Sequence, residues 1–164
     1  MVQTGAHPAD GGGLISLRVA GMVAVIMGVE FTTKRRVEFA DTDAAGIMHF
    51  SRFFTFMEQA EHEFYRSLGF SVDWEKHESL GVGWPRVKAE CEYLKPLRFE
   101  DEVAIHMVVR EVKNRSLLLE FTFRHQDEEV ARGRLTVVCV AKDPATKQLK
   151  AVAIPAAIRT KLET

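Results

Sequence analysis

Alternation of apolar and polar residues with a period of two runs through the second half of this chain, and it constrains the fold more than any other feature. In "RVKAECEY", residues 86–93, alternate positions are apolar or charged: Val87, Ala89, Cys91 and Tyr93 against Arg86, Lys88, Glu90 and Glu92. Such alternation is typical of a β-strand with one face on the core and the other in water. We therefore expect a strand whose charged residues share the solvent face.

Further strands are expected on the same grounds. The segments that repeat the alternation are 101–112, 116–125 and 134–142, and "TKRRVEF" at 33–39 adds a strand before them. The connections at 113–115 and 126–129 are short enough for hairpins, so we expect an antiparallel sheet.

A single segment has helical periodicity. Between residues 50 and 68, apolar residues recur at steps of three and four: Phe53, Met57, Ala60, Phe64 and Leu68. This predicts an amphipathic helix, with Ser51 as a candidate N-cap and Gly69 at the left-handed stop. The expected fold class is therefore α+β, with one long helix packed on a curved antiparallel sheet of about five strands. Such a sheet has edge strands that dimerisation could satisfy.

Length and composition indicate one ordinary globular domain. The chain has 164 residues, 46% of them hydrophobic and 27% charged, with a formal net charge of -1. This balance does not favour nucleic acid as a partner. Cys91 and Cys139 lie in strand-like segments without a CxxC motif, so we expect reduced thiols in a cytoplasmic protein, and neither zinc nor another metal.

The first 29 residues differ from the rest. Residues 14–29 are apolar but carry Arg18, and the run is too short for a good membrane span, so no stable membrane insertion is expected. A signal peptide is disfavoured because no basic residue precedes the apolar run. We interpret residues 1–29 as a disordered or over-called N-terminal extension, with the working start near Met27, and residues 30–164 as the domain.

The segment "DTDAAGIMHF", residues 41–50, places two aspartates before a glycine and the predicted helix. Either aspartate could cap the helix or close an Asx turn, and we assign Asp41 that role. A carboxylate beside a helix N-terminus could also activate water or attack a carbonyl carbon, while the helix amides polarise the carbonyl oxygen.

Two longer segments resemble a known family. "VEFADTDAAGIMHFSRFFTFMEQAEHEF" and "VKAECEYLKPLRFEDEVAIH" are similar to the hotdog-fold acyl-CoA thioesterases of the 4-hydroxybenzoyl-CoA thioesterase type, which include Tol–Pal-associated thioesterases. The resemblance covers about residues 31–155. It implies a hotdog fold, hydrolysis of an acyl-CoA to free acid and CoA without a cofactor, and a homodimer or homotetramer with active sites between subunits.

The resemblance also assigns roles to residues of the aspartate segment. It implies that Asp43 is the catalytic carboxylate, as nucleophile or general base, and that Gly46 is the motif glycine. It further implies that the helix start polarises the thioester carbonyl through backbone N–H atoms that belong to His49 and Phe50. Many relatives carry a histidine where this chain has Phe50, and here the histidine comes one residue earlier.

Four other residues complete the predicted site. Lys113 and Arg115 occupy positions that bind coenzyme A phosphates in the family, although exposed turn residues are the plainer interpretation. Glu58 is either a second carboxylate that orients water or holds the loop, or a solvated helical residue. Trp84 could line the acyl pocket or belong to the core.

Alternatives remain at this level. A thioesterase acting on acyl carrier protein, or a non-catalytic hotdog protein that binds acyl-CoA, would have much the same pattern, because a fold does not determine a function. The nature of the acyl group is left open, since aromatic, branched and medium-chain groups all suit an apolar pocket.

Overall fold

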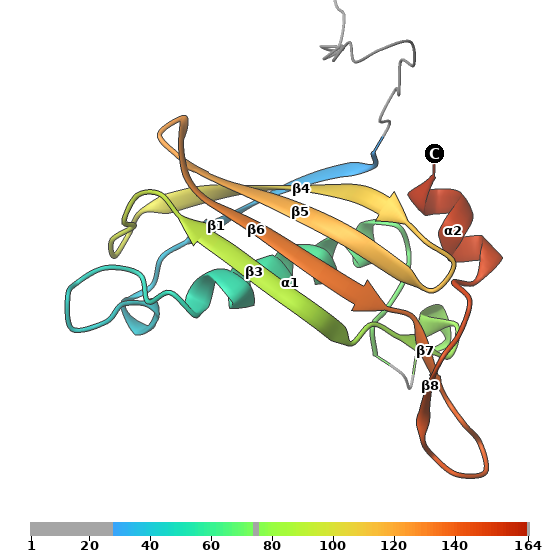
Figure 1. Ribbon diagram of the computed structural model, residues 1–164. Coiled ribbons are helices and arrows are strands. Elements are labelled where there is room, and N and C mark those ends of the chain that lie inside the picture. The colour runs from blue at the N-terminus through green and yellow to red at the C-terminus, as the bar shows by residue number, and fades with distance from the viewer. Residues whose placement is uncertain (1–27, 74–75, 164) are drawn as a thin grey trace, which may run out of the picture.

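A five-stranded antiparallel sheet forms the body of the protein (Figure 1). The structure, a computed structural model, describes residues 28–73 and 76–163. In spatial order, the strands are β1 (Glu30–Arg36), β4 (Glu102–Val112), β5 (Ser116–His125), β6 (Glu128–Val138) and β3 (Arg86–Tyr93). The predicted α+β class and the antiparallel sheet are therefore confirmed, with β1 and β3 at the two edges.

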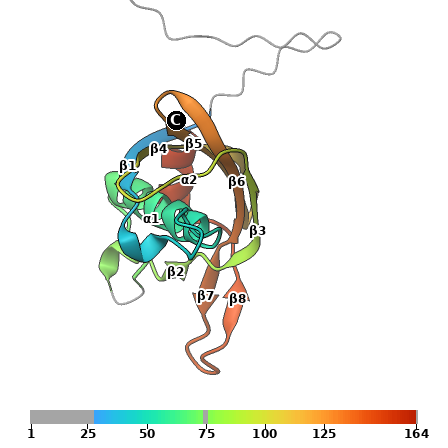
Figure 2. The same cartoon turned by 90° about the vertical axis from the view of Figure 1, so that its left-hand side faces the viewer.

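The long helix α1 (Arg52–Ser67) lies in the concave face of this sheet (Figure 2). Its apolar stripe packs on the inner residues of β4, β5 and β6, which form one core cluster. Gly133 on β6 allows a close approach, because a Cβ atom added there would lie 2.2 Å from Sδ of Met57. The missing side chain is thus part of how the helix fits against the sheet.

The ends of α1 follow the prediction only in part. Gly69 has a φ of +80°, as expected for the residue after a helix C-terminus. The helix begins at Arg52, however, and the side chain of Ser51 makes no capping hydrogen bond. The predicted Ser51 cap is wrong, because Ser51 already has helical backbone angles and its hydroxyl faces the imidazole of His49.

A second, three-stranded sheet was not expected. It contains β2 (Val82–Gly83), β7 (Val140–Lys142) and β8 (Leu149–Ala151), followed by the short helix α2 (Ala156–Leu162). The segment 134–142 is therefore not one strand, because the chain leaves the main sheet at Cys139, whose N–H donates to the carbonyl of Arg115. Two one-turn helices, η1 (Phe39–Asp41) and η2 (His77–Ser79), complete the described elements.

The edge strand β3 departs from simple alternation. Its pairing with β6 is irregular between Arg86 and Lys88, so Arg86 lies opposite Val137 while Lys88 lies opposite Thr136. Because of this bulge, the side chain of Arg86 points toward α1, on the same face of the sheet as Val137. Val87 is left 63% exposed. The expectation that Arg86 shares the solvent face is therefore wrong, since a bulge inserts one extra residue into the alternation.

The described part of the chain begins at Gly28. The prediction for residues 1–29 lies outside the described residues except for Gly28 and Val29, and the carbonyl of Val29 accepts a hydrogen bond from Val109. None of the described helices has the length and apolar character needed to cross a membrane.

Candidate active site

The segment 41–50 folds into a tight loop before α1. The N–H of Asp43 donates to the carbonyl of Ile47, and that of Gly46 donates to the carbonyl of Asp43, both at 2.9 Å. Gly46 has a φ of +73°, a left-handed conformation that glycine adopts without steric cost. The side chain of Asp43 is exposed, and its Oδ1 accepts a hydrogen bond from Ala45 N–H at 2.8 Å. That single bond fixes the direction of the carboxylate.

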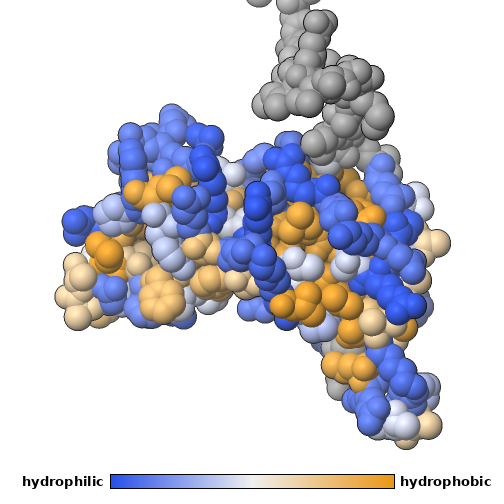
Figure 3. Space-filling model, viewed as in Figure 1, coloured by the Kyte–Doolittle hydropathy of each residue, from blue (hydrophilic) through white to orange (hydrophobic). Residues whose placement is uncertain are grey.

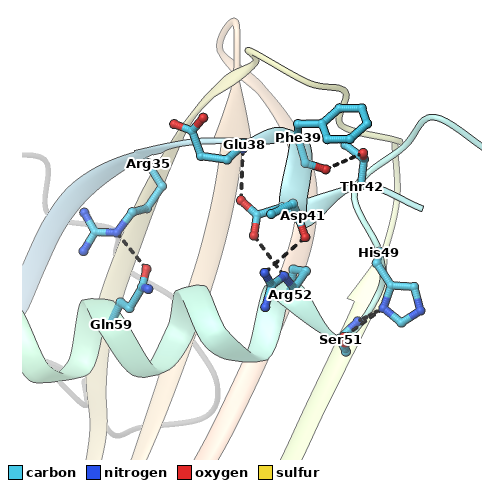
Figure 4. Close-up of polar contacts among 10 residues, drawn as sticks. Arg35, Glu38, Phe39, Asp41, Thr42, His49, Ser51, Arg52 and Gln59 are labelled. Atoms are coloured by element: carbon cyan, nitrogen blue, oxygen red, sulfur yellow. Dashed lines mark hydrogen bonds and ion pairs between the residues drawn. The ribbon is translucent and has the colours of Figure 1, made fainter. Parts of the chain in front are cut away.

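Asp41 ties this loop to the helix (Figure 4). Its Oδ2 accepts from the N–H of Glu38 at 3.0 Å, and its Oδ1 lies 2.9 Å from Nε of Arg52. Asp41 is buried, and it caps the one-turn helix η1 instead of α1. The expected cap of the long helix is therefore wrong: Asp41 accepts a capping hydrogen bond in η1 and reaches α1 only through its ion pair with Arg52.

The backbone amides at the start of α1 are not equivalent. The N–H of His49 donates to the carbonyl of Asp41 at 2.8 Å, and that of Ser51 lies 3.4 Å from Nδ1 of His49. Among the described residues, the N–H of Phe50 between them has no hydrogen-bond acceptor. The first amides of a helix are unpaired and carry partial positive charge, so this N–H is available to an incoming oxygen atom.

An apolar pocket of about 390 Å³ opens beside these groups. Its lining residues are Asp43, Ile47, Met48, Phe50, Phe53, Tyr93, Leu94, Lys95, Pro96 and Leu97. The hydroxyl of Tyr93 donates to the carbonyl of Phe50 at 3.2 Å, which links the end of β3 to the start of the helix. The pocket thus combines one carboxylate, one free amide and several aromatic rings.

The remaining predicted site residues lie away from this pocket. Trp84 is buried, and its ring stacks on Tyr65 with centroids 5.6 Å apart. Lys113, with a side chain 63% exposed, lies 3.3 Å from the carboxylate of Glu111 in the β4–β5 turn, next to exposed Arg115. Glu58 lies further along α1. Their predicted roles stay predictions.

Glu58 belongs to a polar cluster between α1 and the start of β3, which we call the Arg86 cluster: Arg86, Glu58, Glu61 and His62. The guanidinium Nη1 lies 3.0 Å from Glu58 Oε1, and Nη2 lies 2.6 Å from Glu61 Oε2 and 3.3 Å from His62 Nε2. Glu61 is 0% exposed, whereas the side chains of Glu58 and Arg86 are 47% and 29% exposed. The cluster therefore has one buried member, Glu61, while Glu58 and Arg86 are partly exposed to solvent.

The environment shifts the protonation of this cluster. Burial raises the pKa of Glu61 to about 7, although the positive charge of Arg86 opposes the shift. Burial, followed by the charge of Arg86, lowers the pKa of His62 and so favours the neutral imidazole. Glu61 Oε1 and the hydroxyl of Tyr65 are both buried and make no hydrogen bond of good geometry, although the two groups lie near each other.

Sequence reasoning missed Arg86 and Glu61 as parts of one cluster. The available signal was the position of Glu61 beside the apolar stripe of α1, where an unpaired carboxylate is costly to bury. The bulge that turns Arg86 inward left no mark in the alternation.

Other groups offer less for catalysis. A hollow of about 550 Å³ lies over the outer residues of β4, β5, β6 and β3, where Arg110 and Arg134 both pair with Glu120. Three arginines and three glutamates line the hollow in all, so its charges balance. Burial raises the pKa values of Cys91 and Cys139 to about 11, which keeps both as thiols. In residues 28–73 and 76–163, no group of three or more His, Cys, Asp or Glu side chains could hold a metal ion.

Comparison with known proteins identifies related sequences and structures. The sequence pattern of the thioesterase-like superfamily matches residues 37–162. A protein of Aquifex aeolicus (strain VF5) named "Putative esterase" is 34% identical over 113 residues, which are 69% of this chain and 86% of that protein. The 1,4-dihydroxy-2-naphthoyl-CoA hydrolase of Prochlorococcus marinus (strain NATL2A) is 27% identical over 121 residues, 70% of this chain and 77% of that one. The structure of BH1999 gentisyl-coenzyme A thioesterase superposes with a TM-score of 0.69 at 32% identity, covering 82% of this chain and all 100% of the other.

Proposed function

Because this chain belongs to the thioesterase-like superfamily, we propose that it hydrolyses the thioester bond of an acyl-coenzyme A to a free acid and coenzyme A. One observation carries the proposal: the carboxylate of Asp43 and the free N–H of Phe50 both lie at the same apolar pocket. Thioester hydrolysis needs a group that attacks or activates water and a donor for the developing oxyanion. These two groups fill both roles.

The chemistry follows from the start of α1. A thioester oxygen that accepts from Phe50 N–H lies at the positive end of the helix dipole, which stabilises negative charge on that oxygen as the carbonyl carbon becomes tetrahedral. Asp43 then either attacks this carbon to form an anhydride, which water hydrolyses, or removes a proton from the attacking water. The thiolate of coenzyme A leaves in both routes. The N–H of His49 is already bonded to Asp41, so Phe50 is assigned the donor role.

The pocket favours an aromatic acyl group. Rings of Phe50, Phe53 and Tyr93 surround it, and flat rings pack well against aromatic side chains. Relatives of this chain are named for 1,4-dihydroxy-2-naphthoyl-CoA and gentisyl-coenzyme A. We therefore assign hydroxylated aromatic acyl groups as the substrate class.

The active unit is a homodimer in this proposal. The outer edge of β3 has no neighbouring strand among the described residues. Val87 and Tyr93 are exposed on the strand, and Leu94 is exposed directly after it. Figure 3 views the molecule from the side of β3 and shows hydrophobic residues over the start of β3 and the end of β6, bordered by hydrophilic ones. A second copy of β3, running antiparallel, would pair with this edge and cover the apolar side chains.

Coenzyme A is assigned to the β4–β5 turn. Lys113 and Arg115 extend into solvent there, and the carbonyl of Lys113 accepts a hydrogen bond from Arg159 of α2 at 2.6 Å. This contact holds the turn through its backbone, and the exposed side chains of Arg115 and of Lys113, which would exchange its ion pair with Glu111, can reach phosphate.

A thiol-release assay tests the proposal. We expect the purified protein to release coenzyme A from benzoyl- and 4-hydroxybenzoyl-CoA, and to act poorly when the same acyl groups are carried by acyl carrier protein. A preference for the carrier protein would contradict the substrate assignment. Tight binding of acyl-CoA without any release would mean a binding protein instead.

A further inference from the structure

The free N–H of Phe50 belongs to a peptide unit that hydrogen bonds hold in place. A trans peptide is planar, so this unit moves only when the Cα atom of His49 or of Phe50 shifts, or when the plane turns about the line between these two atoms. At the first end, the N–H of His49 donates to the carbonyl of Asp41 at 2.8 Å. Turning is limited because the carbonyl of His49 accepts from the N–H of Arg52 at 2.9 Å. The direction of the free N–H therefore depends on what holds Phe50 at the other end.

Tyr93 holds that other end. Its hydroxyl donates to the carbonyl of Phe50 at 3.2 Å, and among the described residues no backbone N–H donates to the same carbonyl. Phe50 is 59% exposed, so packing of its side chain adds little support. Burial, followed by the neighbouring thiol of Cys91, raises the pKa of Tyr93 to about 12, so the hydroxyl keeps the proton that it donates. Tyr93 thus fixes the backbone of Phe50 from outside the helix.

The ring of Tyr93 is itself held in place. It packs edge-to-face on the buried ring of Phe53, with centroids 5.2 Å apart. Tyr93 is the last residue of β3, and directly after it the N–H groups of Leu94 and Lys95 both donate to the carbonyl of Val130. The end of the strand is therefore a firm support from which the hydroxyl reaches the start of α1.

We propose that Tyr93 is a positioning residue for thioester hydrolysis: its hydroxyl holds Phe50 so that the free backbone N–H points at the carbonyl oxygen of the bound thioester. The inference rests on the proposed function and adds a side chain of the sheet to the donor that the helix supplies. A donor stabilises an oxyanion best when it is already aimed at the place where the charge develops. Loss of the hydroxyl should therefore weaken stabilisation of the transition state more than substrate binding.

Kinetics of two matched variants give the first test. Tyr93→Phe keeps the ring on Phe53 and removes only the hydroxyl. The kcat for benzoyl-CoA should fall by about tenfold, less than the roughly 10²–10³ typical of losing an oxyanion donor, while KM changes by less than about twofold. The control is Tyr65→Phe at the other tyrosine of the chain, whose buried hydroxyl makes no hydrogen bond of good geometry and whose ring stacks on Trp84 away from the pocket. It should keep the wild-type kcat. Wild-type kcat in Tyr93→Phe would overturn the inference and leave the proposed function intact.

Sedimentation and thermal melting separate positioning from a structural role. Tyr93 lies on the edge strand that we assign to the dimer, so its substitution could act through assembly. Tyr93→Phe should sediment like the wild type and melt close to it, because the ring and the backbone of β3 are retained. A fall in kcat that follows dissociation of the dimer, and that disappears at high protein concentration, would overturn the inference.

The carbonyl stretching frequency of a bound thioester measures the contact itself. In Asp43→Asn, benzoyl-CoA with an isotope label at the thioester carbonyl should bind without rapid turnover, and the hydrogen bond from Phe50 should lower the infrared frequency of its C=O bond. Adding Tyr93→Phe should move this band back to higher frequency, whereas adding Tyr65→Phe should leave it in place. The same frequency with and without the Tyr93 hydroxyl would overturn the inference. Because this measurement needs no hydrolysis, it decides the role of Tyr93 separately from a wild type that releases no coenzyme A, which would contradict the proposed function.

Discussion

The backbone N–H of His49 is bonded to the carbonyl of Asp41, at 2.8 Å. This bond closes the loop that carries Asp43, and it leaves the neighbouring N–H of Phe50 as the amide that can meet a substrate oxygen. Two amides that are adjacent in sequence therefore differ: the N–H of His49 is used within the loop, and the N–H of Phe50 is not.

Asp43→Asn should abolish most of the turnover. Asparagine keeps the shape and can accept the bond from Ala45 N–H, but it lacks the charge needed for attack or proton removal. We expect kcat to fall by about 10²–10⁴ with little change in melting temperature. His49→Ala retains the backbone N–H and should lose less than about tenfold. Near wild-type kcat in Asp43→Asn, or a dead His49→Ala, would refute the assignment.

Asp41→Asn should lower the stability of the fold more than it lowers turnover. The substitution keeps a possible acceptor for Glu38 N–H but removes the ion pair with Arg52, one partner of which is buried. We expect a loss of about 1–2 kcal/mol in the free energy of unfolding, measured by urea denaturation. Arg52→Met should cost a comparable amount, and the double variant should cost less than the sum of the two. Additive costs would argue against the ion pair.

Lys113→Ala and Arg115→Ala should weaken the binding of coenzyme A esters. Phosphate contacts far from the carbonyl contribute to ground state and transition state alike, so KM should rise while kcat changes little. A short thioester without the nucleotide should be hydrolysed at the wild-type rate. Lys34→Ala, which also removes an exposed lysine from an ion pair, serves as the control. Equal losses on both substrates would assign the turn to folding.

Val87→Glu should disrupt the dimer. Val87 is 63% exposed in one chain, so glutamate costs the subunit little, whereas a second β3 would bury the new charge against itself. Sedimentation should show a larger monomer fraction, and specific activity should fall on dilution. Leu149→Glu, an exposed apolar position on β8, should sediment like wild type. A wild-type protein that is a fully active monomer would contradict the pairing.

Glu61 should make stability depend on pH. Burial raises the pKa of its folded-state carboxyl from 4.5 to about 7, so between these values the folded protein holds a proton that the unfolded chain releases. Stability from this group is complete below about pH 4.5 and is lost as the pH rises to about 7, by on the order of 3 kcal/mol. The difference in unfolding free energy between wild type and Glu61→Gln should therefore fall between about pH 4.5 and pH 7 in urea titrations.

Glu63 provides a control of opposite sign. Burial raises the pKa of Glu63, but hydrogen bonds from Thr33 and Arg35 outweigh it, and the net pKa is lowered. The difference between wild type and Glu63→Gln should rise with pH, in a window below the ordinary carboxyl pKa. The same trend in both variants would show that the pH dependence arises elsewhere.

The sequence predicted those features that follow from regular periodicity. Alternation identified the main strands, and the three- and four-residue steps identified α1, because both patterns come directly from backbone geometry. The family resemblance is confirmed by the match over residues 37–162 and by the fold. The end of β6 before Cys139 and the bulge beside Val87 were not predicted, because each depends on contacts with other strands that a local sequence pattern does not show.

The candidate site was predicted unevenly for the same reason. Asp43 and Phe50 are close in sequence to the helix start, so their proximity follows from the chain itself. Arg86 and Glu61 are separated by 25 positions, and their ion pair exists only because β3 returns alongside α1. The position of Glu61 beside the apolar stripe of α1 indicates that this acid needs a buried partner, but the sequence does not identify Arg86 as that partner.

The bulge beside Val87 gives β3 two alternation frames, one for Arg86 and another for the residues from Lys88 onward. Deleting Val87 would restore regular alternation without moving Arg86, because Arg86 and Lys88 already lie opposite the consecutive residues Val137 and Thr136. Straightening the strand with every residue retained would instead turn Arg86 to the outer face, away from Glu58 and Glu61. Among homologues, a sequence with a gap aligned with Val87 would therefore keep its arginine on the concave face, and its alternation pattern alone would place that arginine correctly.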